Sequence, residues 1–129
     1  EFPAFLAGIN AGAEFVMVSH LSVPGITGDN TPSSLSAIVV NDVLRGQLGY
    51  NGIVITDAMN MGAIVDAYGS GESAVMAVQA GVDMVLMPAD LQDAAEALTE
   101  AIKIGVISEE RVNEALWHIL SLKYDKGIL

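Results

Sequence analysis

Three short apolar runs, each preceded by a glycine, divide the chain into similar units. We expect these runs to be strands, over Phe15–Val18, Gly52–Ile55 and Met84–Met87. None of them contains a polar residue, and the strand with Ile53, Val54 and Ile55 should be buried on both faces. This pattern is typical of parallel sheets that are covered by helices on both faces.

The segments between the runs carry apolar residues at helical spacing, and several of them end at a glycine. We place helix N-caps at Ser36, Asp90 and Ser108, because their side chains can accept a hydrogen bond from the first helical turn. Residues 21–34 are interpreted as a long loop, and residues 59–69 as a loop or a loose helical turn. The expected helices are Pro3–Ala11, Ala37–Leu48, Gly71–Ala80, Leu91–Ile104 and Glu109–Asp125.

This alternation of strands and helices predicts an α/β fold in which right-handed crossovers connect parallel strands. Units of this kind build a (β/α)8 TIM barrel, but three of them cannot close one. We therefore expect the C-terminal portion of a TIM barrel: three parallel strands with outer helices, forming an incomplete barrel. Since no linker or low-complexity segment interrupts the chain, residues 1–129 are interpreted as one domain.

The charge and composition of the chain exclude several classes of partner. Sixteen acidic residues against five basic ones give a net charge of −11, which opposes binding to nucleic acid or to an anionic membrane. Cysteine is absent, which excludes disulfides and cysteine-bound metals. No apolar run approaches the roughly 20 residues of a membrane-spanning helix. We expect neither a metal nor a cofactor, since no second histidine or carboxylate lies at ligand spacing from His20.

Asp57 is the strongest candidate for chemistry, because it stands where the middle strand should end. In α/β folds, ligands and reactions gather at the carboxyl ends of the strands. The alternative is that Asp57 only caps the following helix, as aspartate often does. His20 ends the preceding strand on the same rim, and is either a functional neighbour of Asp57 or a structural histidine bonded to the long loop. Asp83 is interpreted as a surface or capping acid, and His118 as a solvated surface residue.

Several segments, in order along the chain, resemble the N-terminal (β/α)8 domain of glycoside hydrolase family 3. Val54–Met61, with the sequence Val-Ile-Thr-Asp-Ala-Met-Asn-Met, resembles the motif that holds the nucleophile of that family. Glu14–His20 and Ala80–Pro88 are similar to the sixth and eighth strands of its barrel. Pro32–Gly52 resembles the helix and turn that lead to the seventh strand, and Val112–Gly127 resembles the helix that closes the barrel.

By this resemblance Asp57 is the nucleophile of a retaining glycosidase, and the substrate is a carbohydrate. His20, Met59 and Met61 are the candidate substrate-binding residues, although methionine is more often a core residue. The Met-Asn-Met continuation favours the β-N-acetylglucosaminidase branch, while Ala58 departs from the Asp-Asp pair that is frequent there. The alternative is a β-glucosidase of the same family, many of which have Trp after the nucleophile.

The resemblance also implies that the first half of the barrel, with the general acid/base loop and most sugar contacts, is missing from these residues. The chain is then expected to be inactive in isolation, and to associate with the missing half or with a copy of itself. Two alternatives of another class are a non-catalytic half-barrel assembly piece and a phosphoacceptor receiver domain. The second requires an acidic pair after the first strand and a Lys after the last, where this chain has Ser19-His20 and Pro88-Ala89.

Overall fold

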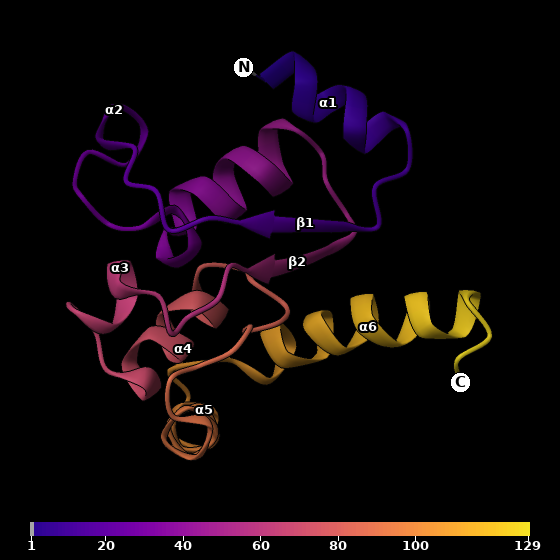
Figure 1. Cartoon of the computed structure of the whole chain (residues 1–129). Helices are drawn as coiled ribbons and strands as arrows, with labels where there is room; N and C mark the ends of the chain where they lie inside the picture. The colour runs from indigo at the N-terminus through magenta and orange to yellow at the C-terminus, as the bar shows by residue number, and fades with distance from the viewer. Residues whose placement is uncertain (1) are drawn as a thin grey trace.

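Two parallel strands, β1 (Phe15–Val18) and β2 (Ile53–Thr56), lie side by side in the middle of the structure. They are described from a computed structural model of residues 2–129, which leaves Glu1 outside the described part. Figure 1 shows helices on both sides of this pair. Both strands point toward the end of the molecule where α2 (Pro24–Thr27) and α3 (Gly62–Val65) lie. The expected α/β fold with parallel strands is therefore confirmed.

The third apolar run, Met84–Met87, lies beside β2 in the expected parallel direction but does not form a regular strand. Within the described residues, Met84 alone of this run pairs with β2, through an isolated bridge. Leu86 donates its N–H to the hydroxyl of Thr56 at 3.0 Å instead of to a carbonyl of β2. Met87 has a φ of 49°, in the left-handed region, so the backbone leaves the extended conformation there. The prediction of three regular strands is therefore wrong, because a side-chain contact replaces the backbone ladder after one bridge.

Four α-helices coincide with helices that the sequence predicts. They are α1 (Phe2–Asn10), α4 (Ser70–Gln79), α5 (Leu91–Lys103) and α6 (Glu109–Asp125). Asp90 accepts a hydrogen bond from the Asp93 N–H at 3.0 Å, and Ser108 accepts one from the Arg111 N–H at 3.1 Å. These two expected N-caps are confirmed.

The helix η2 (Ile38–Gln47) differs from the expected α-helix, because it is wound as a π-helix. Its wider turns are seen in the bond from the Leu48 N–H to the Val43 carbonyl, five residues earlier, at 2.9 Å. This winding turns Leu48 toward the core, where α-helical spacing would place Gln47, so Leu48 is half-buried and Gln47 is exposed. The expected N-cap at Ser36 is wrong, since no side chain caps η2 and Ser36 is buried before it.

The core lies where β2, η2 and α4 meet. Val54 of β2, Val40 of η2 and Ala77 of α4 are fully buried there. Ile64 from α3 and Met59 from the turn after β2 belong to the same cluster. Burial of each large apolar side chain contributes about 1.5–3 kcal/mol, so these contacts hold β2 and the turn after it in place.

The long loop after β1 folds back onto the end of that strand. Ser22 and Pro32 form an antiparallel bridge that closes the base of the loop. A short 3-10 helix, η1 (Ser33–Leu35), follows, and the Ser34 N–H donates to the Ser19 carbonyl at 3.1 Å. The loop is thereby held at the carboxyl end of the strand pair, beside Asp57.

Candidate active site

Asp57 lies directly at the carboxyl end of β2, where that strand borders β1. Val18 and Thr56, the last residues of the two strands, are partners in the ladder. The next N–H, that of Asp57, donates to the Val18 carbonyl at 2.9 Å. The backbone of Asp57 is therefore fixed by the last hydrogen bond of the strand pair. A fixed backbone suits a reacting group, because a small displacement of such a group slows a reaction.

The half-buried side chain of Asp57 has one oxygen engaged with the backbone. Oδ1 accepts a hydrogen bond from the Ala58 N–H at 2.8 Å. The alternative role, a cap on the next helix, does not apply, because α3 begins at Gly62 with Met61 at its N-cap position. The contact with Ala58 orients the carboxylate through Oδ1.

His20 connects the long loop to the turn that follows Asp57. Its Nε2 lies 3.0 Å from the Ala58 carbonyl, and its Nδ1 lies 2.7 Å from the Ser34 hydroxyl. The ring is buried, and both nitrogens are bonded inside the protein. Each of the two alternatives for His20 therefore describes part of its position: it adjoins the Asp57 turn, and it is bonded to the long loop.

One of the two candidate methionines lies in the core and the other at the surface. Met59 is 2 % exposed, and its N–H donates to the Leu86 carbonyl at 2.9 Å. Met61 is 45 % exposed and precedes α3. The structure therefore places Met59 in the packing beneath the turn, and Met61 at the surface.

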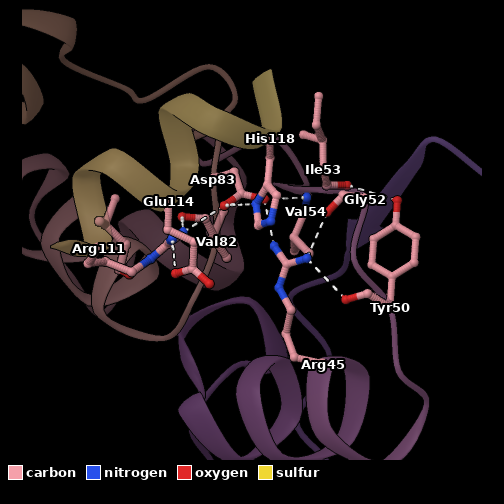
Figure 2. A network of polar contacts seen from close by, with 11 residues as sticks. Arg45, Tyr50, Gly52, Ile53, Val54, Val82, Asp83, Arg111, Glu114 and His118 are labelled. Carbon is pink, nitrogen blue, oxygen red and sulfur yellow. Dashed lines mark hydrogen bonds and ion pairs between the residues drawn. The ribbon is translucent and has the colours of Figure 1, made fainter. Parts of the chain in front are cut away.

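A buried ion network lies at the opposite, amino-terminal end of β2 (Figure 2). At its centre is Asp83, whose side chain is 0 % exposed. Its Oδ2 accepts from Arg45 Nη2 at 2.6 Å and from the Val54 N–H at 2.9 Å. Its Oδ1 accepts from Arg111 Nη2 at 2.7 Å, and His118 Nδ1 lies 3.2 Å from the same oxygen. The expectation that Asp83 and His118 are surface residues is wrong, because partners distant in sequence enclose both side chains.

The two arginines of the network also bind backbone carbonyls. Arg45 Nη1 donates to the Gly52 carbonyl at 2.7 Å, and Arg111 Nη2 donates to the Val82 carbonyl at 2.8 Å. Arginine suits both positions because its planar guanidinium donates several bonds in fixed directions. These are the only arginines in the sequence. Asp83 stands inside an apolar run, and such an acid in a chain with two arginines is the signal that could have identified the network.

The network keeps Asp83 charged in spite of its burial. Burial alone would raise the pKa of Asp83, but the bonds from the Val54 N–H and Arg111 and the charge of Arg45 hold that pKa below its ordinary value. Burial raises the pKa of Tyr50, whose hydroxyl donates to the Ile53 carbonyl at 3.2 Å. In barrel folds this end of the strands serves stability, so the network is interpreted as a structural anchor.

Residues 2–129 bring no three His, Cys, Asp or Glu side chains together in an arrangement that could hold a metal ion. Among the helices described there, none combines the length and the apolar character needed to cross a membrane. An apolar groove of about 230 Å³ lies between α1, β1, α2 and η2, and neither Asp57 nor His20 lines it. The groove is therefore separate from the candidate active site.

A parallel α/β unit with a fixed acid at the carboxyl end of a strand is the arrangement of barrel enzymes. The family model for the glycosyl hydrolase family 3 N-terminal domain matches residues 1–122. The β-N-acetylglucosaminidase/β-glucosidase of Cellulomonas fimi is 31 % identical over 96 % of this chain and 24 % of that protein. The lysosomal β-glucosidase of Dictyostelium discoideum is 33 % identical over 98 % of this chain and 15 % of that protein. The chain belongs to glycosyl hydrolase family 3.

Solved structures of the family have the same fold over most of this chain. The glycoside hydrolase family 3 β-N-acetylglucosaminidase from Paenibacillus sp. str. FPU-7 matches with a TM-score of 0.93 and 38 % identity, over 96 % of this chain and 24 % of that one. The β-N-acetylhexosaminidase from Beutenbergia cavernae DSM 12333 matches with a TM-score of 0.84 and 38 % identity, over 94 % of this chain and 36 % of that one. The chain thus spans 15–24 % of the two relatives named above and 24–36 % of these two solved structures.

Proposed function

We propose that this chain carries the nucleophile of a retaining glycoside hydrolase, with Asp57 in that role and a β-N-acetylglucosaminide as the substrate. The position of Asp57 gives the strongest support. Its N–H is bonded to the end of β1, and Oδ1 of its carboxylate is held by the Ala58 N–H. In barrel enzymes, catalytic side chains come from this end of the strands.

The proposed reaction has two displacements at one carbon. In the first, Oδ2 of Asp57 attacks the anomeric carbon, the bond to the leaving oxygen breaks, and a proton donor protonates that oxygen. In the second, the same group takes a proton from water, which attacks the anomeric carbon and releases Asp57 as a carboxylate. The Ala58 N–H keeps its bond to Oδ1 and so holds the carboxylate in one orientation through both steps.

The proton donor is proposed to come from a segment outside these 129 residues. In the usual two-carboxylate pattern, the donor lies about 5–5.5 Å from the nucleophile. His20 adjoins the Asp57 turn, but both of its ring nitrogens are bonded to protein groups. By the resemblance to the family, the proton donor lies on a loop in the other half of the barrel. We therefore expect no turnover by the 129-residue polypeptide alone.

We also propose that residues 1–129 are about strands six to eight and the closing helix of a (β/α)8 barrel. In the described residues β1 has a paired strand on one side, and Met17 on it is 55 % exposed. On α6, Trp117 is 72 % exposed, and Tyr124 and Leu116 are exposed as well. Open sheet edges and apolar patches bind other segments of chain. The proposed partner is the missing half of the barrel, with a copy of this chain as the alternative.

The choice of an N-acetylglucosaminide has support from sequence and from structure. The Met-Asn-Met continuation and the 38 % identity to the Paenibacillus structure both favour it. The β-glucosidase alternative is supported by the Dictyostelium relative of that name, which is 33 % identical. Met61 is the side chain proposed to meet the sugar, while Met59 and His20 support the site from the protein side.

Release of nitrophenol from aryl glycosides tests this proposal in the full-length enzyme that contains the chain. The wild type should hydrolyse the N-acetyl-β-glucosaminide, and Asp57→Ala should lose several powers of ten in rate, because the covalent route is removed. Asp57→Asn should be nearly as inactive, since the amide keeps the shape and loses the charge. Asp42→Asn, a change at an exposed aspartate on η2, is the matched control and should keep wild-type activity.

Two outcomes would change the proposal. Full activity of Asp57→Ala would remove Asp57 as the nucleophile. Faster hydrolysis of the nitrophenyl β-glucoside than of the N-acetyl-β-glucosaminide would place the enzyme in the β-glucosidase branch.

A further inference from the structure

The side chain of Ser34 is fully buried, at 0 % exposure, and it takes no part in the reaction proposed above. It lies in η1, which is docked on the end of β1 through the bond from the Ser34 N–H to the Ser19 carbonyl. Its hydroxyl lies 2.7 Å from Nδ1 of His20. A buried hydroxyl or ring nitrogen is costly without a partner, and this contact satisfies both.

The two partners of His20 determine which ring nitrogen carries the proton. The Ala58 carbonyl can only accept, so Nε2–H donates to it across 3.0 Å. In the neutral ring Nδ1 is then an acceptor, and the Ser34 hydroxyl donates to it. Together, Ser34 and Ala58 hold the ring in one tautomer and one orientation.

The Ala58 carbonyl belongs to the turn that carries the Asp57 carboxylate. The Asp57 N–H is bonded to the Val18 carbonyl at 2.9 Å, and the Ala58 N–H is bonded to Oδ1 of Asp57 at 2.8 Å. The Ala58 carbonyl accepts a hydrogen bond from the Met61 N–H within the same turn, at 3.1 Å, and one from Nε2–H of His20, at 3.0 Å. The bond from His20 is the one that ties this carbonyl to a different segment of the chain. Without it this peptide is held by the Met61 bond and by the bond from the Met59 N–H to the Leu86 carbonyl at 2.9 Å. The Ala58 N–H that orients Oδ1 is then held less firmly.

We propose that Ser34 is a positioning residue of the hydrolase: through His20 it fixes the Asp57–Ala58 turn and thereby orients the nucleophile. The inference rests on the proposed role of Asp57. It adds that the long loop after β1 sets the geometry of a catalytic group at the end of β2. A displacement of about 1 Å at a reacting group can cost about a hundredfold in rate, so the contact matters even though Ser34 does not touch substrate.

Ser34→Ala and Ser33→Ala in the full-length enzyme form a matched pair of variants. Ser33 is also buried, but its hydroxyl donates to the Leu21 carbonyl at 2.7 Å. We expect Ser34→Ala to lower kcat by about ten- to a hundredfold, with KM changed by less than about twofold. Ser33→Ala should keep kcat near that of the wild type, and Ser34→Thr, which retains the hydroxyl, should restore most of the rate.

The nitrogen-15 resonances of the His20 ring separate positioning from a general loss of folding. In the wild type, Nε2 should have the shift of a protonated nitrogen, and Nδ1 that of an acceptor with a hydrogen bond. Ser34→Ala should move the Nδ1 resonance toward that of an unbonded lone pair, whereas Ser33→Ala should not. If Ser34→Ala does not fold, Ser34→Cys replaces it; its weaker donor should give an intermediate shift and an intermediate kcat.

The inference is overturned by a wild-type kcat in Ser34→Ala, by an unmoved Nδ1 resonance, or by an equal loss of rate in Ser33→Ala. These outcomes differ from failure of the proposed function. An inactive Asp57→Asn beside a fully active Ser34→Ala keeps Asp57 as the nucleophile and removes Ser34. Full activity of Asp57→Asn removes the nucleophile, whatever the ring resonances show.

Discussion

Replacement of Asp83 by asparagine should destabilise the fold by about 3–5 kcal/mol. The variant keeps the shape of the side chain but removes the charge that faces Arg45 at 2.6 Å and Arg111 at 2.7 Å. It also puts an NH2 group in place of one carboxylate oxygen. That group then faces donors, either Arg45 with the Val54 N–H or Arg111 with His118. Uncompensated charge and unsatisfied donors act in the same direction.

The effect should be large because the network is enclosed and joins separate elements. Arg45 comes from η2, Arg111 and His118 come from α6, and the Val54 N–H belongs to β2. The side chains of these three partners are 13–15 % exposed, so solvent screens their charges weakly. Small domains are stable by about 5–15 kcal/mol, so the expected loss is a large part of the total.

Urea denaturation of the 129-residue polypeptide, monitored by circular dichroism, measures this loss. For a slope of about 2 kcal/mol per molar urea, the midpoint should fall by roughly 2 M. Asp42→Asn, at an exposed aspartate on η2, is the control and should change stability by less than about 0.5 kcal/mol. A shift for Asp83→Asn no larger than that of the control would refute the reasoning that the network holds the fold together.

The pH dependence of stability, measured by the same urea titration, tests the direction of the Asp83 pKa shift. The pKa of Asp83 in the folded chain lies below the value of 3.8 that an unperturbed aspartate has. Its contribution to stability is therefore fully present above that value and is lost as the pH falls through the folded pKa. The wild type should lose stability below about pH 4 more steeply than Asp83→Asn does. Parallel profiles for the two proteins would contradict this origin of the pKa shift.

Two further predictions concern the backbone and the open faces. Gly81 has a φ of +105°, and a Cβ there would displace the Asn41 side chain and lie 3.2 Å from Cγ1 of the buried Val40, whereas Gly105 has a φ of +78° with nothing within 4 Å. Gly81→Ala should therefore lower the urea midpoint clearly more than Gly105→Ala, which meets backbone strain alone; equal midpoints would show that the clash is relieved elsewhere. The 129-residue polypeptide should sediment as an associated species, and Met17→Lys with Trp117→Glu should raise its monomer fraction. A well-folded wild-type monomer at high concentration would contradict the proposed open faces.

Features set by neighbouring residues could be predicted from the sequence. Asp90 and Ser108 cap helices because each side chain reaches an N–H three residues later, within the same segment. The strand Phe15–Val18 has the bounds that its apolar run predicts. Asp57 at a strand end also follows from a local pattern, and the family resemblance added a role that spacing alone left open.

Features that depend on distant residues could not be predicted. Asp83 is buried by Arg45, which is 38 residues earlier, and by Arg111, which is 28 residues later. His20 likewise reaches Ala58, 38 residues along the chain. The run from Met84 reads as a strand by composition, yet its pairing ends after one bridge because a threonine hydroxyl takes the next N–H. In each case the fold chooses the deciding partner. The acid within an apolar run indicates that Asp83 needs cationic partners, but it does not indicate how the elements that carry them are arranged.

Mass spectrometry of a trapped glycosyl-enzyme tests the nucleophile itself. The full-length enzyme is treated with a fluorinated N-acetylglucosaminide whose covalent intermediate is hydrolysed slowly, and is then digested. Because attack forms an ester between the carboxylate and the anomeric carbon, one peptide should gain the mass of a single sugar, and fragmentation should place it on Asp57. Asp57→Asn should give no modified peptide. A sugar attached to a different carboxylate of the wild type would contradict the assignment of Asp57 as the nucleophile.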